Sequence, residues 1–197
     1  MFTGIIEEIG IIEKIEKDRD NIILYIYCAF LDEIKINQSI SHNGICLTVT
    51  SLNKNNYTVC LISETIRKTN ASSWKIGNRI NLERCLKIGD RLDGHFVQGH
   101  IDSIIECVNI DDQEGSWVFE FKYPQEYAKY IVPKGSISIN GVSLTIAEVN
   151  DNKSFFTVAI IPYTFKYTNF KSIKKGDFVN TEFDILTKQI VRINEKK

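Results

Sequence analysis

The 197-residue sequence has few prolines, no paired cysteine motif, no excess of charge and no long apolar run. Its five cysteines are odd in number and form no C-x-x-C pair, which argues against a disulfide framework or a zinc site and favours reduced thiols. The formal net charge of −1 offers no electrostatic footprint for nucleic acid or an anionic membrane. No stretch reaches the ~18 apolar residues of a membrane span, and the N-terminus has no signal-peptide pattern. We therefore expect a soluble, cytoplasmic protein without nucleic-acid or membrane partners.

A long internal repeat dominates what is present. Residues 38–50 read QSISHNGICLTVT and residues 135–147 read GSISINGVSLTIA, an offset of 97 residues from Cys46 to Ser143. This period is far above the ~20–50 residues of solenoids and propellers, so it indicates duplication of a whole domain. Two homologous modules predict two similar binding sites.

Both modules have strand-like patterns. Residues 21–27, 57–62 and 116–121 are rich in β-branched and aromatic side chains. Asn43-Gly44 and Asn140-Gly141 follow alternating polar and apolar residues, and such dipeptides favour tight reversals between strands. Short strands separated by turn signals predict an all-β fold with a small barrel in each half. We place the first module at residues 1–92 and the second at 93–184, with a polar linker over 86–94 between the repeats.

Helical patterns are scarce. Residues 65–69 and 164–168 predict short turns, and residues 125–132 predict a helix that ends before Pro133. Leu186, Ile190 and Ile193 share one face of a C-terminal helix, in a segment (185–197) that lies outside the repeat. That apolar face predicts packing on a barrel or, in preference, on another subunit.

Positions at which the two modules differ are the candidates for chemistry. In the aligned repeat, Cys46 corresponds to Ser143, Ile5 to His100, and Glu64 to Tyr163. His100 has the residue type of a general base near neutral pH, although a hydrogen-bonded histidine at the edge of a module gives the same pattern. Cys46 is compatible with a nucleophile or with a small buried side chain.

The other polar candidates carry weaker signals. Lys134 predicts either an anion or carbonyl contact or a solvated turn residue, and Asp184 predicts a helix N-cap. His42 is interpreted as a packing or solvated residue, and His95 as a residue near the linker that serves the backbone turn. No metal-ligand spacing, glycine-rich phosphate loop or G-x-S-x-G elbow is present, so no metal site is expected.

Taken together, these motifs resemble the riboflavin synthases of the alpha-chain type. The matching pieces run in the family's order along essentially the whole chain, and as an ordered set they are highly specific. They are residues 1–7 (MFTGIIE), 43–49 (NGICLTV), 64–65 (ET), 94–102 (GHFVQGHID), 134–136 (KGS), 141–145 (GVSLT) and 161–164 (IPYT).

The resemblance implies a homotrimer of tandem six-stranded Greek-key barrels with the C-terminal helix at the trimer core. It implies a dismutation in which one 6,7-dimethyl-8-ribityllumazine donates four carbons to another, giving riboflavin and 5-amino-6-ribitylaminouracil. No cofactor or metal is needed, and lumazine synthase is a candidate partner. The alternative is a non-catalytic lumazine- or flavin-binding antenna protein of the same fold.

The resemblance also implies a set of site residues, with each site formed between the N-terminal barrel of one subunit and the C-terminal barrel of its neighbour. The catalytic candidates are His100, Cys46, Ser143 and Asp184. The expected N-terminal pocket contains Gly4, Ile5, Ile6, Cys46, Leu47, Thr48, Ile62, Ser63, Glu64 and Thr65. Its expected mate contains Gly99, His100, Ile101, Lys134, Ser143, Leu144, Thr145, Ile161, Pro162, Tyr163, Thr164, Phe165 and Lys166.

Two residues depart from the family's pattern. Tyr163 stands where histidine or glutamate is frequent, which argues against a catalytic task for that side chain. Asn140 stands where aspartate is common, which argues against a charge-based role there.

Overall fold

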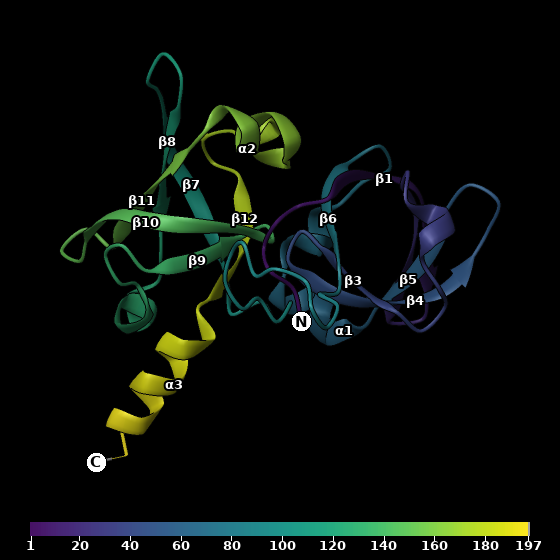
Figure 1. Ribbon diagram of the computed structural model, residues 1–197, viewed down its shortest axis with the longest axis horizontal. Coiled ribbons are helices and arrows are strands. Elements are labelled where there is room, and N and C mark those ends of the chain that lie inside the picture. The colour runs from purple at the N-terminus through teal and green to yellow at the C-terminus, as the bar shows by residue number, and fades with distance from the viewer. Residues whose placement is uncertain (197) are drawn as a thin grey trace.

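The computed structural model describes residues 1–196 and contains two closed, six-stranded antiparallel barrels followed by a C-terminal helix (Figure 1). This confirms the predicted all-β fold with two homologous barrels. Barrel 1 comprises β1 (Glu8–Asp18), β2 (Asn21–Tyr27), β3 (Ser39–His42), β4 (Ile45–Leu52), β5 (Tyr57–Leu61) and β6 (Arg79–Arg84). Barrel 2 comprises β7 (Ser103–Asp112), β8 (Trp117–Lys122), β9 (Ser136–Ile139), β10 (Val142–Asn150), β11 (Phe155–Ile160) and β12 (Phe178–Phe183).

Each barrel has the Greek-key order. The strands of barrel 1 run β1-β2-β5-β4-β3-β6 around the barrel, so β6 returns by a long connection to lie beside β3. Barrel 2 repeats this order, with β12 beside β9. Closure pairs the backbone groups that an open sheet would leave free at its edges.

Each barrel encloses its own apolar core. The inward positions of the alternating strands supply Leu24, Ile26 and Val59 in barrel 1, and Phe119, Phe121 and Phe156 in barrel 2. All six are at most 1% exposed. The second core is therefore the more aromatic of the two.

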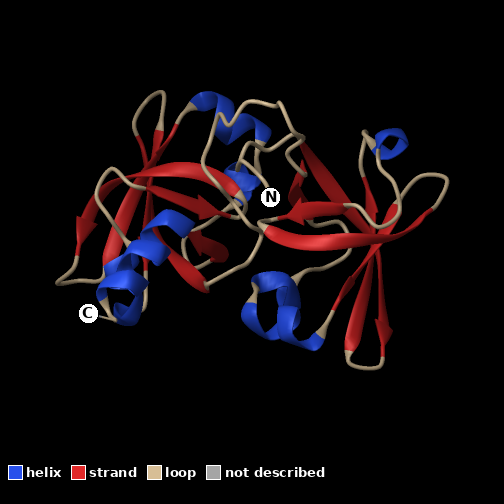
Figure 2. Cartoon of the chain, turned by 60° about the horizontal axis from the view of Figure 1, so that its bottom comes forward, coloured by secondary structure: helices blue, strands red, loops and turns tan. Residues whose placement is uncertain are grey.

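Short helices connect the strands, as Figure 2 shows in blue. The predicted turns near residues 65–69 and 164–168 are single-turn helices, α1 (Ser63–Lys68) and α2 (Pro162–Tyr167). The helix predicted over 125–132 is a shorter 3₁₀ helix, η3 (Gln125–Tyr130), because Ile131 is buried in the barrel 2 core and takes an extended conformation. The remaining 3₁₀ helices are η1 (Leu31–Glu33), η2 (Asn70–Ser73) and η4 (Asn169–Ser172).

The C-terminal helix α3 (Ile185–Asn194) extends from the end of barrel 2 and contacts η3 (Figure 1). Asp184 is its N-cap and accepts a hydrogen bond from the backbone N–H of Leu186 (3.0 Å), as the sequence predicted. Lys188 forms an ion pair with Asp102 of barrel 2 (2.8 Å). In residues 1–196 no helix has the length and apolar character needed to cross a membrane.

The two Asn-Gly turns meet where the barrels touch. Asn43-Gly44 and Asn140-Gly141 both adopt positive φ angles, and the backbones of the two glycines lie against each other. The side chain of Asn81 donates to the carbonyl of Asn140 (2.8 Å), and that of Asn180 donates to the carbonyl of Asn43 (2.9 Å). Equivalent contacts in both directions relate the barrels by an approximate two-fold axis.

Candidate functional site

Two segments that precede the barrels cross from one barrel to the other. The first opening segment is residues 2–6 and the second opening segment is residues 97–101. Their backbones pair antiparallel at Phe2 and Val97, with hydrogen bonds of 2.7 and 3.0 Å. Each segment then continues along a strand of the opposite barrel.

The crossing is defined by one backbone hydrogen bond at each site. The carbonyl of Gly4 accepts from the N–H of Ser143 on β10 (2.8 Å), and the carbonyl of Gly99 accepts from the N–H of Cys46 on β4 (2.9 Å). Both glycines have positive φ, and a Cβ at either position would lie 2.5 Å from the Cβ of the residue it faces. Only glycine therefore allows these approaches.

A cavity of about 250 Å³ lies beside Cys46. Residues of barrel 1 form one wall and the second opening segment forms the other. The cavity is lined by Ile45, Cys46, Ile62, Glu64, Thr65, Lys68, Thr69, Gly99, His100 and Ile101. It brings together seven of the residues that the sequence singled out.

At the equivalent place on barrel 2, Ser143 contacts a histidine. Nδ1 of His95 lies 2.7 Å from Oγ of Ser143, and His95 is only 8% exposed. The backbone of His95 is held by a hydrogen bond from its N–H to the carbonyl of Thr3 (3.0 Å). His95 thus presents a buried imidazole to the Ser143 hydroxyl, a contact that the local sequence did not predict.

The expected grouping of the opening segments is wrong. Gly4, Ile5 and Ile6 were grouped with Cys46, but Gly4 contacts Ser143, and Ile6 packs on the core of barrel 2. Ile5 instead lines a separate cavity beside Glu7 and Arg84 of barrel 1. The second opening segment shows the reverse, since Ile101 packs on the core of barrel 1. The repeat identified the right segments, but the direction of their crossing is a property of the tertiary structure.

Several other predicted residues lie outside the Cys46 cavity. Leu47 is buried in the core of barrel 1 and Leu144 packs against that of barrel 2, whereas Thr48 and Thr145 are exposed on the neighbouring strand positions. The hydroxyl of Ser63 donates to the carbonyl of Asp20 (3.3 Å).

Lys134 and the side chains of helix α2, which were expected beside Ser143, have contacts of their own. The ammonium of Lys134 donates to the carbonyl of Ala147 (3.3 Å), four residues further along β10. In the repeat, Ile161 and Thr164 correspond to Ile62 and Thr65, which line the Cys46 cavity, and Pro162 corresponds to Ser63, which does not. Three side chains of α2 are held by aromatic contacts: Tyr163 packs on Tyr167, Phe165 stacks on Trp117, and Lys166 lies over the ring of Tyr167.

Burial sets the charge states of Cys46 and His95. Desolvation raises the pKa of the Cys46 thiol, so this cysteine is an uncharged thiol at neutral pH. Desolvation also lowers the pKa of His95, while the charge of Asp184 acts in the opposite direction. His95 is therefore a neutral imidazole at neutral pH, able to accept a proton. His100 is exposed and faces the Cys46 cavity.

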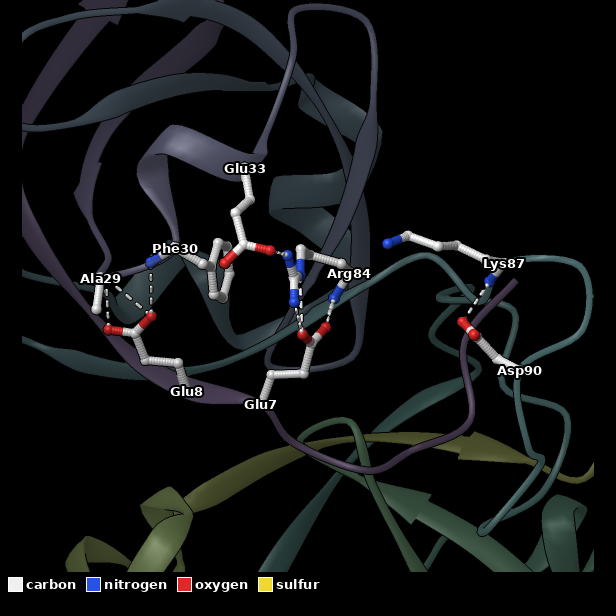
Figure 3. A network of polar contacts seen from close by, with 8 residues as sticks. All are labelled: Glu7, Glu8, Ala29, Phe30, Glu33, Arg84, Lys87 and Asp90. Atoms are coloured by element: carbon white, nitrogen blue, oxygen red, sulfur yellow. Dashed lines mark hydrogen bonds and ion pairs between the residues drawn. The ribbon is translucent and has the colours of Figure 1, made fainter.

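A polar network fastens the first opening segment where it leaves barrel 1 (Figure 3). The guanidinium of Arg84 donates to Glu7 (2.5 and 2.8 Å) and Glu33 (2.6 Å) and lies over the ring of Phe30. Glu8 accepts from the backbone N–H of Ala29 (2.7 Å). Figure 3 shows the chain turning away from barrel 1 immediately before Glu7.

Over residues 1–196, no group of three or more histidine, cysteine, aspartate or glutamate side chains is arranged to hold a metal ion. Besides backbone amides, the side-chain groups of the two sites are a thiol, several hydroxyls, two imidazoles, and the Glu64 carboxylate and Lys68 ammonium of the Cys46 cavity. Such groups support proton transfer and hydrogen bonding to a polar, planar ligand.

Known proteins share both the sequence and the fold. The lumazine binding domain family matches this chain twice, over residues 3–85 and 98–184. A riboflavin synthase of Actinobacillus pleuropneumoniae is 40% identical over all of this chain and 91% of its own length. A riboflavin synthase of Bacillus subtilis is 38% identical over the same shares.

Solved structures agree with these matches. Crystal structures of LumP complexed with riboflavin and with 6,7-dimethyl-8-(1'-D-ribityl) lumazine superpose with TM-scores of 0.86 and 0.84, at 28% and 26% identity. Both alignments cover 93% of this chain and 99% of the LumP chain. With two matched domains and full-length relatives of this similarity, the chain belongs to the lumazine-binding domain family of the riboflavin synthases.

Proposed function

We propose that this protein is a riboflavin synthase that converts two molecules of 6,7-dimethyl-8-ribityllumazine into riboflavin and 5-amino-6-ribitylaminouracil. The observation that carries the proposal is full-length identity of 40% to a riboflavin synthase, combined with the equivalent contacts of the two opening segments with Cys46 and Ser143. One molecule donates a four-carbon unit and the other accepts it. The reaction needs no added cofactor.

The duplication suits a reaction between two like molecules. Two homologous sites hold the same compound in related orientations, so that one acts as donor and the other as acceptor. Fixing both partners replaces a bimolecular encounter by an effectively intramolecular one. We propose that the Cys46 cavity of one subunit faces the Ser143 site of a neighbouring subunit.

The two sites support different chemical tasks. We propose that His95, kept neutral by burial, accepts the proton lost from the C7 methyl group of a lumazine, and that Ser143 contacts the reacting ring. Asp184 favours the imidazolium that forms. Cys46 and His100 contact the second lumazine, whose ribityl chain lies along Glu64 and Thr65.

We further propose a homotrimer assembled through α3. Leu186, Ile190 and Ile193 are each about 60% exposed on one face of this helix, and their burial between subunits would stabilise an assembly. All five cysteines are free, which supports a cytoplasmic location. An association with lumazine synthase remains a prediction.

Turnover by the purified protein tests the proposal. Incubation with 6,7-dimethyl-8-ribityllumazine should yield one riboflavin for every two molecules consumed, followed by absorbance and chromatography. A tight, fluorescent complex with lumazine and no riboflavin would instead identify the protein as a non-catalytic antenna protein of the same fold, which is the main alternative.

A further inference from the structure

Two buried glutamates occupy equivalent positions at the ends of the barrels. Glu83 on β6 is 3% exposed and Glu182 on β12 is 1% exposed. The repeat aligns them, since Asn81-Leu82-Glu83 corresponds to Asn180-Thr181-Glu182. A buried carboxylate is costly unless its oxygens accept hydrogen bonds, so the donors that satisfy these two side chains identify their task.

Both carboxylates accept their hydrogen bonds from the opening segment of their own barrel. Glu83 accepts from the backbone N–H groups of Thr3 (2.6 Å) and Gly4 (3.0 Å) and from the hydroxyl of Thr3 (2.7 Å). Glu182 accepts from the backbone N–H groups of Gln98 (2.6 Å), Gly99 (2.8 Å) and His100 (2.8 Å). Three charge-assisted hydrogen bonds thus fix each segment at its turn.

The fixed segments, however, form part of the opposite site. The segment held by Glu182 carries the Gly99 carbonyl to Cys46 and forms the His100 wall of the barrel 1 cavity. The segment held by Glu83 carries the Gly4 carbonyl to Ser143 of barrel 2. Each glutamate is therefore connected to a site on the barrel to which it does not belong.

We propose that Glu83 and Glu182 are positioning residues with exchanged targets, so that Glu182 sets the geometry of the Cys46 site and Glu83 sets that of the Ser143 site. The assignment of these sites to lumazine binding rests on the proposed function. Neither glutamate touches the reacting atoms, and both act through two or three residues of backbone. The exchange makes each site depend on the integrity of both barrels.

The protonation of these carboxylates depends on the same geometry. Burial raises the pKa of Glu83 to about 6 and also raises that of Glu182, while the hydrogen bonds from the opening segments act in the opposite direction. A protonated carboxyl has one acceptor oxygen fewer for the three donors. The opening segment held by Glu83 should therefore loosen as the pH falls through about 6.

The test uses the isosteric variants Glu83→Gln and Glu182→Gln of the full chain. Glutamine places an NH₂ group against backbone N–H donors, so it breaks the arrangement without changing its volume. The reporters are the backbone amide resonances of Cys46 and Ser143, each of which bonds to one opening segment. We expect Glu182→Gln to shift the Cys46 amide and leave the Ser143 amide in place, and Glu83→Gln to do the reverse.

Titration with riboflavin, followed at the same two amides, gives the affinity of each site separately. We expect a loss of ~10-fold at the opposite site only, which is the scale of one broken hydrogen bond to a charged group. The two variants are matched controls for each other, because both glutamates are almost fully buried and each accepts three hydrogen bonds. Glu148→Gln, an exposed carboxylate on β10, should change neither reporter.

Three outcomes would overturn the proposal: each variant perturbing only its own barrel, both variants perturbing both reporters equally, or neither variant perturbing any reporter. The amide shifts do not depend on the reaction, so they separate this proposal from the proposed function. If the wild type binds riboflavin but turns over no lumazine, while the two variants show crossed amide shifts, the synthase assignment is refuted and the exchanged positioning stands. Crossed amide shifts without crossed affinities would refute the role at the binding sites.

Discussion

The two barrels share strand order, turns and buried glutamates, yet their interiors are filled differently. In barrel 1, Nε2 of the fully buried His42 lies 2.7 Å from the hydroxyl of Tyr57. The corresponding residues of barrel 2 are Ile139 and Phe156, which are apolar and fully buried. Duplication has thus kept the backbone while one copy carries a polar pair inside its core.

A second difference lies beside the short helices. In barrel 2, Trp117 stacks on Phe165 with 3.7 Å between ring centroids. The corresponding residues of barrel 1, Ile22 and Ile66, border a largely apolar cavity of about 460 Å³. The first module is therefore less completely packed at this place.

The sites and the chain ends differ as well. Ser143 lies within hydrogen-bond distance of the buried His95, whereas Cys46 lines a cavity together with the exposed His100. A linker comes after β6, whereas α3 comes after β12. The two modules thus differ in the side chains at their sites and in the segments that follow their last strands. Both nevertheless have a glycine, Gly4 or Gly99, where the opening segment contacts the opposite barrel.

The largest effect is expected from helix α3, which barrel 2 carries after its last strand and barrel 1 lacks. Deleting residues 185–197 should give monomers without turnover, because the proposed sites face each other between subunits. Mass measurement in solution and a lumazine assay check this. Deleting only residues 196–197 is the control, and trimers that survive the longer deletion would contradict the assembly.

The two histidines provide the next contrast. His95→Gln should lower kcat by ~100-fold, since general acid–base groups contribute about that much, whereas His100→Gln should lower it by ~10-fold or less. Burial of His95 lowers its pKa, so wild-type kcat should stay constant to below the usual histidine range as the pH falls. Steady-state kinetics with thermal unfolding as the folding control checks this; equal losses in both variants would contradict the assignment.

The buried His42 should make barrel 1 sensitive to acid. Desolvation lowers the pKa of His42 to about 4 from its ordinary 6.5. Between these pH values the unfolded chain binds a proton that the folded protein does not. The free energy of unfolding therefore decreases as the pH is lowered from 6.5 to about 4. The loss attributable to His42 is about 2 kcal/mol between pH 7 and pH 5. Glu83 acts oppositely, because burial raises its pKa to about 6.

The double variant His42→Ile with Tyr57→Phe places the barrel 2 residues in barrel 1 and keeps Glu83. It therefore isolates the contribution of His42 to the pH dependence of stability. Its unfolding free energy in urea should lose about 2 kcal/mol less than that of the wild type on moving from pH 7 to pH 5. The same pH dependence in both proteins would refute the role of His42.

The smallest effect is expected from exchanging the side chains beside the helices. Ile22→Trp with Ile66→Phe should fill the barrel 1 cavity and raise stability by ~1 kcal/mol through added apolar burial and stacking. The reverse exchange, Trp117→Ile with Phe165→Ile, should destabilise barrel 2 by a similar or larger amount. Thermal unfolding measures both, and a loss of stability in the first variant would show that its cavity does not accept aromatic rings.

Much of the fold was predictable from local pattern. The Asn-Gly turns, the alternating strands and the apolar face of α3 each depend on residues close together in the sequence, so their signals are local. The helix predicted over 125–132 forms only as the 3₁₀ helix Gln125–Tyr130, because burial of Ile131, a tertiary effect, ends it early. His95 was interpreted as a turn residue because nothing near it in sequence indicates that Ser143 lies beside it.

The sequence by itself determined that there are two barrels with two equivalent sites, because duplication repeats the same turns and strand patterns. Only the tertiary structure decided which opening segment serves which site, because a crossing of the chain leaves no periodic signal. It also decided which histidine meets Ser143 and what Glu83 and Glu182 hold. These contacts join residues more than forty positions apart, and they arise from the way two barrels pack about an approximate two-fold axis.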